Sequence, residues 1–504
     1  MEREDRLTTL AARAALMAVA ALLAWHLMPF GVSAVRAILY PHELDYGEGI
    51  VWYQATQLFD GSAYGPIDRF PSVVFHYTPL FHFVSGLIAV TGVDGLAAGR
   101  LVSALSTLAV MVAIGAIVAG VIRRAGGAKR VAALCGAIGG LALLIAFPVK
   151  IWAPLMRVDM LAFALALIGI LAAIRALERP RWIVAAALLF VAAVYTKQTM
   201  VAAPAAVFAV MLVHRPRTAW AGIALCVAVG AIVLAALTWT TGGGFARHVF
   251  LYNVNRFDLA RTEQIWIIAS SHIFLIGAAL IGVAAAWPAV RRFAAQRRDA
   301  ETDDAALVML LLYLVLTSLM LLLVLKLGSS ANYFVEWLCA VAIFAGLAAR
   351  CTVERALEPS SAGDASLLGK LALVLIGVQA VLIDHNPYSK RWFDAREAGL
   401  QKLAAMIRSA PGPVISDDMV AVMRAGRPVL WEPAIFTELA ATGAYDERPF
   451  VRMIEQRKFA LFIIYQGRGE TVFSPRFSPA VASAIERNYR RDEIVANLTI
   501  HRPR

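Results

Sequence analysis

Long runs of apolar residues, separated by short polar linkers, fill the first three-quarters of the chain. Many of these runs reach the roughly 18 residues that a helix needs to cross a bilayer. The pattern predicts twelve apolar helical segments, at 8–39, 78–92, 97–122, 131–148, 158–176, 182–196, 200–213, 218–240, 265–288, 306–326, 333–349 and 367–383. The first segment is too long for a cleaved signal peptide and lacks a small-residue cleavage site, so we interpret it as an uncleaved first span.

The basic linkers decide how these segments are expected to cross. Four linkers are rich in Arg and Lys, at 123–130, 178–181, 214–217 and 291–298. Such linkers lie in the cytoplasm in most membrane proteins. Twelve crossings from a cytoplasmic N-terminus would place all four outside, whereas all four lie inside if segment 78–92 does not cross. We therefore expect about eleven crossings plus one re-entrant or juxtamembrane helix; a variant lays 131–148 on the surface and misplaces one basic linker.

After residue 383, short apolar runs alternate with helical patterns, which predicts a small α/β domain. The expected strands are 413–416, 428–432, 459–465 and 493–500, and the expected helices are 390–410, 436–442, 448–458 and 478–489. Charge marks the same boundary, since about 26% of residues 384–504 are charged against about 13% of residues 1–383. The predicted fold class is a polytopic α-helical membrane protein, spanning 1–383, with a small soluble α/β domain over 384–504.

Composition excludes several classes of protein. The chain has 504 residues, of which 60% are hydrophobic and 16% charged, and its mean hydropathy is +0.68. An ordinary soluble enzyme, a disordered protein and a disulfide scaffold are all less apolar or richer in cysteine. The net charge of +12 is explained by basic linkers. Without a basic-aromatic stripe outside the membrane, we expect no nucleic-acid partner. The four cysteines form no CxxC pair, which excludes a typical structural zinc site.

Polar residues gather on one side of the expected membrane. In either topology the outer face receives the C-terminal domain and five polar segments, at 40–77, 150–159, 195–199, 241–264 and 327–336. Ionisable residues next to apolar spans usually mark a site or a pathway. The first outer loop, residues 40–77, opens with Glu43, Asp45 and Glu48. Three carboxylates so close repel one another, which raises at least one pKa, and they could share a cation. The alternative is a solvated acidic turn.

The order of several motifs resembles a known family. Glu43-Leu44-Asp45 has the ExD form found in the first outer loop of GT-C type glycosyltransferases. DYGEG (45–49), YGP (64–66) and YTPLFHFVSGLIAVTG (77–92) are similar to bacterial family 39 membrane proteins, the relatives of protein O-mannosyltransferases and of the lipid A aminoarabinose transferase. The similarity continues through MRVDMLAFALAL (156–167), YTKQTMVAAPAA (195–206), SSANYFVE (329–336) and residues 414–450. The resemblance implies a polyprenyl-phosphate sugar donor and a site on the outer face of a bacterial cytoplasmic membrane.

The resemblance assigns roles to the acidic residues. Asp45 matches the proposed base that activates the acceptor hydroxyl, and Glu48 is the next candidate. Asp159 matches a second acidic position at the outer start of a later span, where a helix N-cap is the alternative role. Glu43 is counted with the substrate-binding residues.

Cations and polar groups are needed to hold the donor phosphate. The candidates are Arg157, Lys197 with its neighbour Gln198, and Arg256 beside Asn255. A snorkelling lysine is the alternative for Lys197, and a solvated loop charge is the alternative for Arg256. Three further candidates open a later span, namely Asn332, Tyr333 and Glu336. Glu336 lies one turn inside an apolar helix, so we expect it to face the bundle and to find a partner such as Lys326 or a sugar hydroxyl.

The leading hypothesis is an inverting glycosyltransferase that acts on a hydroxyl acceptor, which could belong to a glycolipid, a polysaccharide or a protein. The alternatives are a lipid-linked glycan transporter or flippase, and a non-catalytic glycan-binding membrane protein. No HxxH or HxxxH spacing occurs, so no metal ligand is assigned, and no cofactor is required. A divalent metal ion stays open, because some GT-C enzymes use one and others do not.

Overall fold

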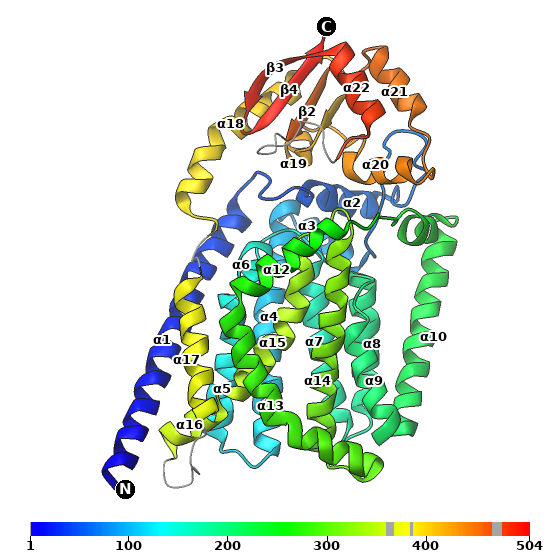
Figure 1. Cartoon of the computed structure of the whole chain (residues 1–504). Helices are drawn as coiled ribbons and strands as arrows, with labels where there is room; N and C mark the ends of the chain where they lie inside the picture. Colours follow the sequence, from blue (N-terminus) through cyan, green and yellow to red (C-terminus); the bar gives the residue numbers. More distant parts are fainter. Residues whose placement is uncertain (1, 359–366, 384–386, 466–475) are drawn as a thin grey trace.

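A bundle of helices forms the larger part of the molecule, and a small α/β domain covers one end of it (Figure 1). The computed structural model describes residues 2–358, 367–383, 387–465 and 476–504. We call the covered end of the bundle the domain end. Seven of the described helices are long and apolar enough to cross a membrane, and four shorter helices are also apolar. The expected class, a polytopic helical membrane protein with a small C-terminal α/β domain, is confirmed.

Most bundle helices follow the predicted apolar runs, because a helix satisfies its own backbone hydrogen bonds inside a bilayer. The bounds of the bundle helices are α1 Glu2–Leu39, α4 Gly95–Arg124, α5 Lys129–Ala142, α6 Phe147–Trp152, α7 Asp159–Ala176, α8 Trp182–Thr196, α9 Ala202–His214, α10 Pro216–Thr240, α13 Ile273–Gln296, α14 Thr302–Met320, α15 Val335–Ala348, α16 Arg350–Leu357 and α17 Leu367–Leu382. Four more helices lie toward the domain end, namely α2 Glu48–Asp60, α3 Leu80–Val90, α11 Gly244–Ala246 and α12 Thr262–Ser271. The single helix expected at 265–288 is wrong, since this segment is divided at His272 between α12 and α13, which continues to Gln296.

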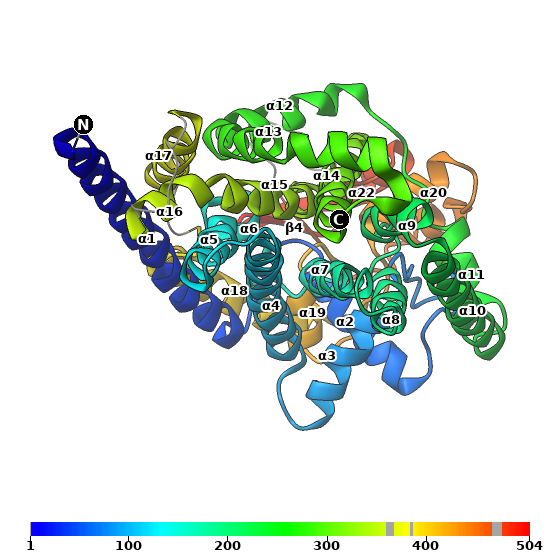
Figure 2. The same ribbon diagram turned by 90° about the horizontal axis from the view of Figure 1, so that it is seen from below.

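Helix α3 is the short helix of segment 78–92. Its 11 residues give a length of about 16 Å, roughly half of the ~30 Å hydrocarbon core of a bilayer. It packs against α2 and the start of α4 at the domain end (Figures 1 and 2). Segment 131–148 instead forms α5, which packs along α4 and α15, then one 3-10 turn at Leu143–Ile145 and the start of α6. Length and packing thus favour 78–92 as the helix that does not cross.

Helix α10 stands at the side of the bundle (Figure 1, right). Its main packing partners in the bundle are α8 and α9, and within this helix Ala219 and Gly222 are the residues that are buried. One polar contact supports its middle, since Tyr195 Oη donates to the Gly230 carbonyl at 2.6 Å. Most of its surface therefore faces away from protein.

The C-terminal domain is built on a four-stranded sheet with the order β1-β2-β4-β3. Its strands are β1 Val414–Ser416, β2 Leu461–Tyr465, β3 Tyr489–Val495 and β4 Leu498–Pro503, and its helices are α18 Lys390–Ser409, α19 Met419–Arg424, α20 Pro433–Ala441, α21 Arg448–Glu455 and α22 Pro479–Asn488. Strand β2 pairs in parallel with β1 and antiparallel with β4. The boundary expected at residue 384 lies outside the described residues.

Two of the expected strands are wrong. Segment 428–432 forms no strand, because Pro433 starts α20 directly after it and Trp431 makes only an isolated bridge to Ser72 of the first loop. Segment 493–500 is not one strand but parts of two, joined by a turn at Ala496 and Asn497. Both turn residues have positive φ, 50° and 66°. Two such residues are typical of the tight turn of a β-hairpin, in which Asn is favoured.

The first loop packs into both hydrophobic cores of the C-terminal domain. Side chains of β2 alternate between the two faces of the sheet, as a strand requires. Leu461 and Ile463 join a core that also holds Leu44 of the first loop, whereas Phe462 and Ile464 join one that holds Val74. The loop and the domain are therefore folded together.

Gly49 packs against the C-terminal domain with no room for a side chain. A Cβ atom at this position of α2 would lie 2.5 Å from the Val420 backbone nitrogen of α19. We expect Gly49→Ala to lower the free energy of unfolding by about 1–3 kcal/mol, since the clash is with backbone. Thermal unfolding of the full chain measures it. Gly120→Ala in α4, where nothing lies within 4 Å of the new Cβ, is the control and should be neutral or stabilising; equal effects at both positions would contradict the close packing.

Candidate active site

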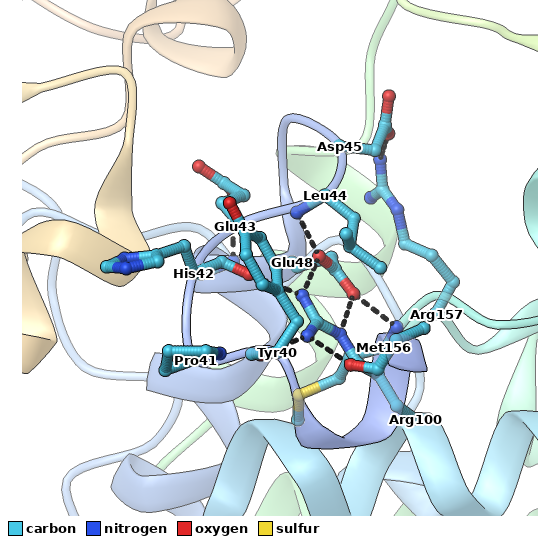
Figure 3. A network of polar contacts seen from close by, with 12 residues as sticks. Tyr40, Pro41, His42, Glu43, Leu44, Asp45, Glu48, Arg100, Met156 and Arg157 are labelled. Atoms are coloured by element: carbon cyan, nitrogen blue, oxygen red, sulfur yellow. Dashed lines mark hydrogen bonds and ion pairs between the residues drawn. The ribbon is translucent and has the colours of Figure 1, made fainter. Parts of the chain in front are cut away.

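The three carboxylates of the acidic turn point in three directions (Figure 3). Glu48 points into the protein and is fully buried with Arg100 of α4. Arg100 donates to its two oxygens at 2.9 and 2.7 Å. The backbone N–H groups of Leu44 and Met156 donate to them as well, each at 2.7 Å. Although burial alone would raise it, Arg100 and these N–H groups hold the pKa of Glu48 below its usual value.

Arg100 also organises the start of the first loop. Its guanidinium donates to the carbonyls of Ala37, Tyr40 and His42 at 2.6–2.7 Å. These carbonyls lie at the C-terminal end of α1 and just beyond it. One arginine therefore ties together α1, the acidic turn and α4, and Glu48 neutralises it.

Asp45 has a different environment. Its side chain is 37% exposed, and Arg157 Nη2 lies 3.2 Å from its Oδ2. The same nitrogen donates to the Tyr46 carbonyl at 2.6 Å. Burial and the charge of Glu48 raise the pKa of Asp45 above its usual value, although Arg157 opposes the shift. Asp45 is thus the accessible carboxylate of the three.

Glu43 faces the C-terminal domain. Its Oε1 accepts from the backbone N–H groups of Gly47 and Gly49 at 3.1 and 3.2 Å. Its carboxyl lies near that of Asp418, at the point where Gly49 of α2 packs against the first residues of α19. Glu43, Asp45 and Glu48 therefore do not converge on a shared cation. Within the described ranges, no group of three or more His, Cys, Asp or Glu side chains is arranged to hold a metal ion.

A second charged cluster lies where α7, α8 and α15 begin or end. Asp159 accepts from Lys197 Nζ at 2.6 Å, from Asn332 Nδ2 at 2.8 Å and from Trp152 Nε1 at 2.8 Å. Asp159 is the first residue of α7 and does not cap it. Lys197 is buried rather than snorkelling, with Nζ 4.7 Å from the centre of the Tyr333 ring.

Two aromatic residues connect the clusters. The Trp152 ring lies under the Arg157 guanidinium, 5.3 Å away, while its indole N–H binds Asp159. Tyr77 of the first loop lies close enough to Arg157, Asp159 and Lys197 to feel their charges, and burial raises its pKa to about 12. Asp45, Arg157 and Lys197 thus belong to one continuous polar site at the domain end.

The other predicted residues divide into two groups. Gln198 lies at the edge of the site and donates to the His76 carbonyl at 2.7 Å. Glu336 is buried in the first turn of α15 and interacts with Lys197. Asn255 and Arg256 are engaged elsewhere. Asn255 donates to the Leu327 carbonyl at 2.9 Å, and Arg256 binds Glu438 of the C-terminal domain at 2.9 and 3.0 Å.

Sequence reasoning missed Arg100, Trp152 and Tyr77. Arg100 carried a usable signal, because it is a charged residue at the start of an apolar run and such residues need a partner. Trp152 and Tyr77 stand inside motifs that resemble the family, but aromatic residues are so common at membrane interfaces that their type alone indicates no role.

Comparison with known proteins identifies the fold. No family profile matches the sequence, and no curated protein matches it. Among solved structures, the chain is similar to ArnT from Cupriavidus metallidurans in the apo state, with 14% identity and a TM-score of 0.56 over 96% of this chain and 97% of that one. It is similar to the same protein bound to undecaprenyl phosphate, with 15% identity and a TM-score of 0.53 over the same shares.

The chain is also similar to the Archaeoglobus fulgidus oligosaccharyltransferase in the apo form. Here the identity is 11% and the TM-score 0.53, over 92% of this chain and 72% of that one. The GT-C fold implied by the motif resemblance is therefore confirmed along nearly the whole chain. At these identities the similarity shows the fold, and the chemistry must be argued from the site.

Proposed function

We propose that this protein is an inverting glycosyltransferase that moves a sugar from a polyprenyl-phosphate donor to a hydroxyl acceptor. The observation that carries the proposal is the environment of Asp45, whose side chain is partly exposed, lies beside Arg157 and has a raised pKa. On a GT-C fold, it is the one carboxylate of the acidic turn that combines an accessible side chain with an arginine beside it. A carboxylate with a raised pKa is suited to take a proton from a hydroxyl.

In the proposed reaction, Asp45 removes the proton as the acceptor oxygen attacks the anomeric carbon from the face opposite the phosphate. A new C–O bond forms, the bond from the anomeric carbon to the phosphate oxygen breaks, and its electron pair leaves with the lipid phosphate. Negative charge therefore develops on the phosphate. Arg157 and Lys197 are the cations of the site that would stabilise it.

The supporting residues have separate roles in this scheme. Asp159, Asn332 and Trp152 hold Lys197 and Arg157 in place. Glu48 is fully occupied by its four donors, so we assign it to shaping the acidic turn rather than to proton transfer. The structure of ArnT bound to undecaprenyl phosphate supports a polyprenyl phosphate as the carrier for this fold.

We place the site on the outer face of a bacterial cytoplasmic membrane. The basic linkers support this orientation, because they gather at the end of the bundle opposite the C-terminal domain (Figure 1). Arg124 pairs with Glu178 across two of them, and His214 contacts the Arg297 carbonyl across the other two. Basic linkers mark the cytoplasmic side.

The test is sugar transfer in membranes that contain the protein, measured against a panel of radiolabelled polyprenyl-phosphate sugars. We expect transfer from at least one donor, and an Arg157→Gln variant that transfers about 100-fold more slowly, because one charged donor to the developing anion is gone. Arg175→Gln is the matched control, since Arg175 also lies over an indole ring, that of Trp182, at the far end of α7. Binding of none of the donors would contradict the proposal.

Arg157→Gln should also change the pH profile. Arg157 lowers the pKa of Asp45, so its removal raises that pKa. A base must be ionised to act, and the acidic limb of kcat/KM should therefore move to higher pH. An unmoved acidic limb would indicate that Asp45 is not the base.

A further inference from the structure

The acidic turn is held by the C-terminal domain on both sides of Asp45. On one side, Glu43 meets Asp418, the residue that caps α19. On the other, Tyr46 Oη donates to Glu432 of the domain at 2.6 Å. Asp45 itself pairs with Arg157, which precedes α7 of the bundle. The position of the Asp45 carboxylate therefore depends on the contacts of the C-terminal domain with Glu43 and Tyr46 in the same turn.

The contact between Glu43 and Asp418 requires a proton. Both side chains are fully buried. Glu43 Oε1 and Asp418 Oδ1 are satisfied by backbone N–H groups, the latter by Ala421 at 2.8 Å. Among the described residues, the other two oxygens, Glu43 Oε2 and Asp418 Oδ2, have no N–H or O–H donor. Two buried carboxyls can hydrogen-bond each other only when they hold one proton between them.

We propose that Glu43 and Asp418 are positioning residues, which share one proton and thereby latch the C-terminal domain onto the turn that presents Asp45. The latch is closed while the proton is present and opens when both carboxyls are ionised, because two buried like charges repel. The consequence for transfer rests on the proposed function. The latch itself does not.

The surroundings of the pair give the direction of its pH dependence. The acidic groups that face it include Asp45, Glu48 and Asp417, together with the phenols of Tyr40 and Tyr465, and the cations on this side are Arg396 of α18 and Arg476, which pairs with Asp417. Burial and the mutual repulsion raise the pKa of Glu43 well above its usual value. The folded protein thus binds this proton more tightly than the unfolded chain does. The stabilisation is complete below the pKa of an unfolded carboxyl and is lost as pH rises through the folded value.

Single amide substitutions should close the latch without a proton. In Asp418→Asn, the amide oxygen keeps the bond from Ala421, so that Nδ2 takes the place of Oδ2 and donates to Glu43. In Glu43→Gln, the amide oxygen keeps the bonds from Gly47 and Gly49, so that Nε2 donates to Asp418. In the double variant two amide nitrogens face each other, and neither accepts. The geometry therefore predicts two tolerated single changes and a harmful combination.

The first measurement is thermal unfolding of the full chain in lipid nanodiscs as a function of pH. For the wild type we expect Tm to fall as pH rises, and for each single amide variant a flatter profile with a higher Tm than the wild type at alkaline pH. The double variant should lie below both. Asp394→Asn, an exposed change on α18, is the control and should follow the wild type. A wild-type slope in Asp418→Asn, or an additive double variant, would overturn the latch.

The second measurement is the transfer rate over the same pH range. We expect kcat of the wild type to fall at alkaline pH and kcat of Asp418→Asn to persist there. At pH values where the wild-type latch is closed, Asp418→Ala should transfer about 100-fold more slowly than the wild type, with a smaller change in KM, because a base displaced by about 1 Å loses roughly this factor. If transfer is absent in every protein while the unfolding pattern holds, the proposed function fails and the latch stands. If transfer follows Asp45 but the unfolding pattern does not hold, the latch fails alone.

Discussion

Replacing Asp45 by Asn is expected to slow sugar transfer by about 10²- to 10⁴-fold, the usual contribution of a positioned general base. The amide is nearly the same size as the carboxylate, so the site around residue 45 should keep its shape. It cannot take the acceptor proton. Single-turnover transfer with a saturating donor, together with donor binding measured separately, distinguishes loss of chemistry from loss of binding.

Asp60→Asn is the matched control for this experiment. Asp60 ends the same helix, α2, is exposed, and accepts only from Ser62 among the described residues. It should transfer at the wild-type rate. An Asp45→Asn variant within a factor of two of the control would contradict the assignment of the base, and the transporter hypothesis would then be the next to test.

Glu48→Ala should have the largest effect on folding. It leaves Arg100 buried without its counter-charge and removes the acceptor for the Leu44 and Met156 N–H groups. Breaking a buried ion pair on one side costs about 3–5 kcal/mol. We expect a strongly lowered Tm in nanodiscs, or loss of the folded protein from the membrane fraction.

Glu493→Gln provides the comparison for that loss. It breaks the exposed ion pair between Lys402 and Glu493 in the C-terminal domain, and such pairs contribute at most about 1 kcal/mol. The Asp45→Asn variant, in which the buried pair is intact, should unfold close to the wild type. Similar Tm values for Glu48→Ala and Glu493→Gln would show that Arg100 does not organise the loop.

The length of the apolar runs is enough to predict most of the bundle. A run of about 20 apolar residues has one stable state in a bilayer, so α4, α10 and α15 follow their segments within a few residues. Linker charge adds the expectation that segment 78–92 does not cross. The C-terminal domain is harder, because its strands are short and the first loop contributes to the cores that bury them. The sequence pattern therefore predicts a single strand across the hairpin at Ala496 and Asn497.

The sequence predicts which residues belong to the site, but it does not predict which side chains bind one another. The sequence indicates that Asp45, Arg157 and Lys197 approach the same end of the bundle. It contains no signal that Asn332 binds Asp159, from which it is separated by 173 positions, or that Asp418 meets Glu43. Such pairs are created by packing. The same limit explains Arg256, which resembles a phosphate ligand in its sequence context and instead holds Glu438.

Helix α10 has a consequence for handling the protein. Its large side chains Trp220, Val227, Ile232 and Trp239 are all more than half exposed, and its main contacts are with α8, α9 and α11. In the membrane, acyl chains supply the missing van der Waals contacts. A detergent micelle is more fluid and supplies them less uniformly, so α10 is the helix that extraction should loosen first. The lipid that surrounds α10 should therefore contribute to the stability of the folded protein, and its identity should be controlled in every stability measurement.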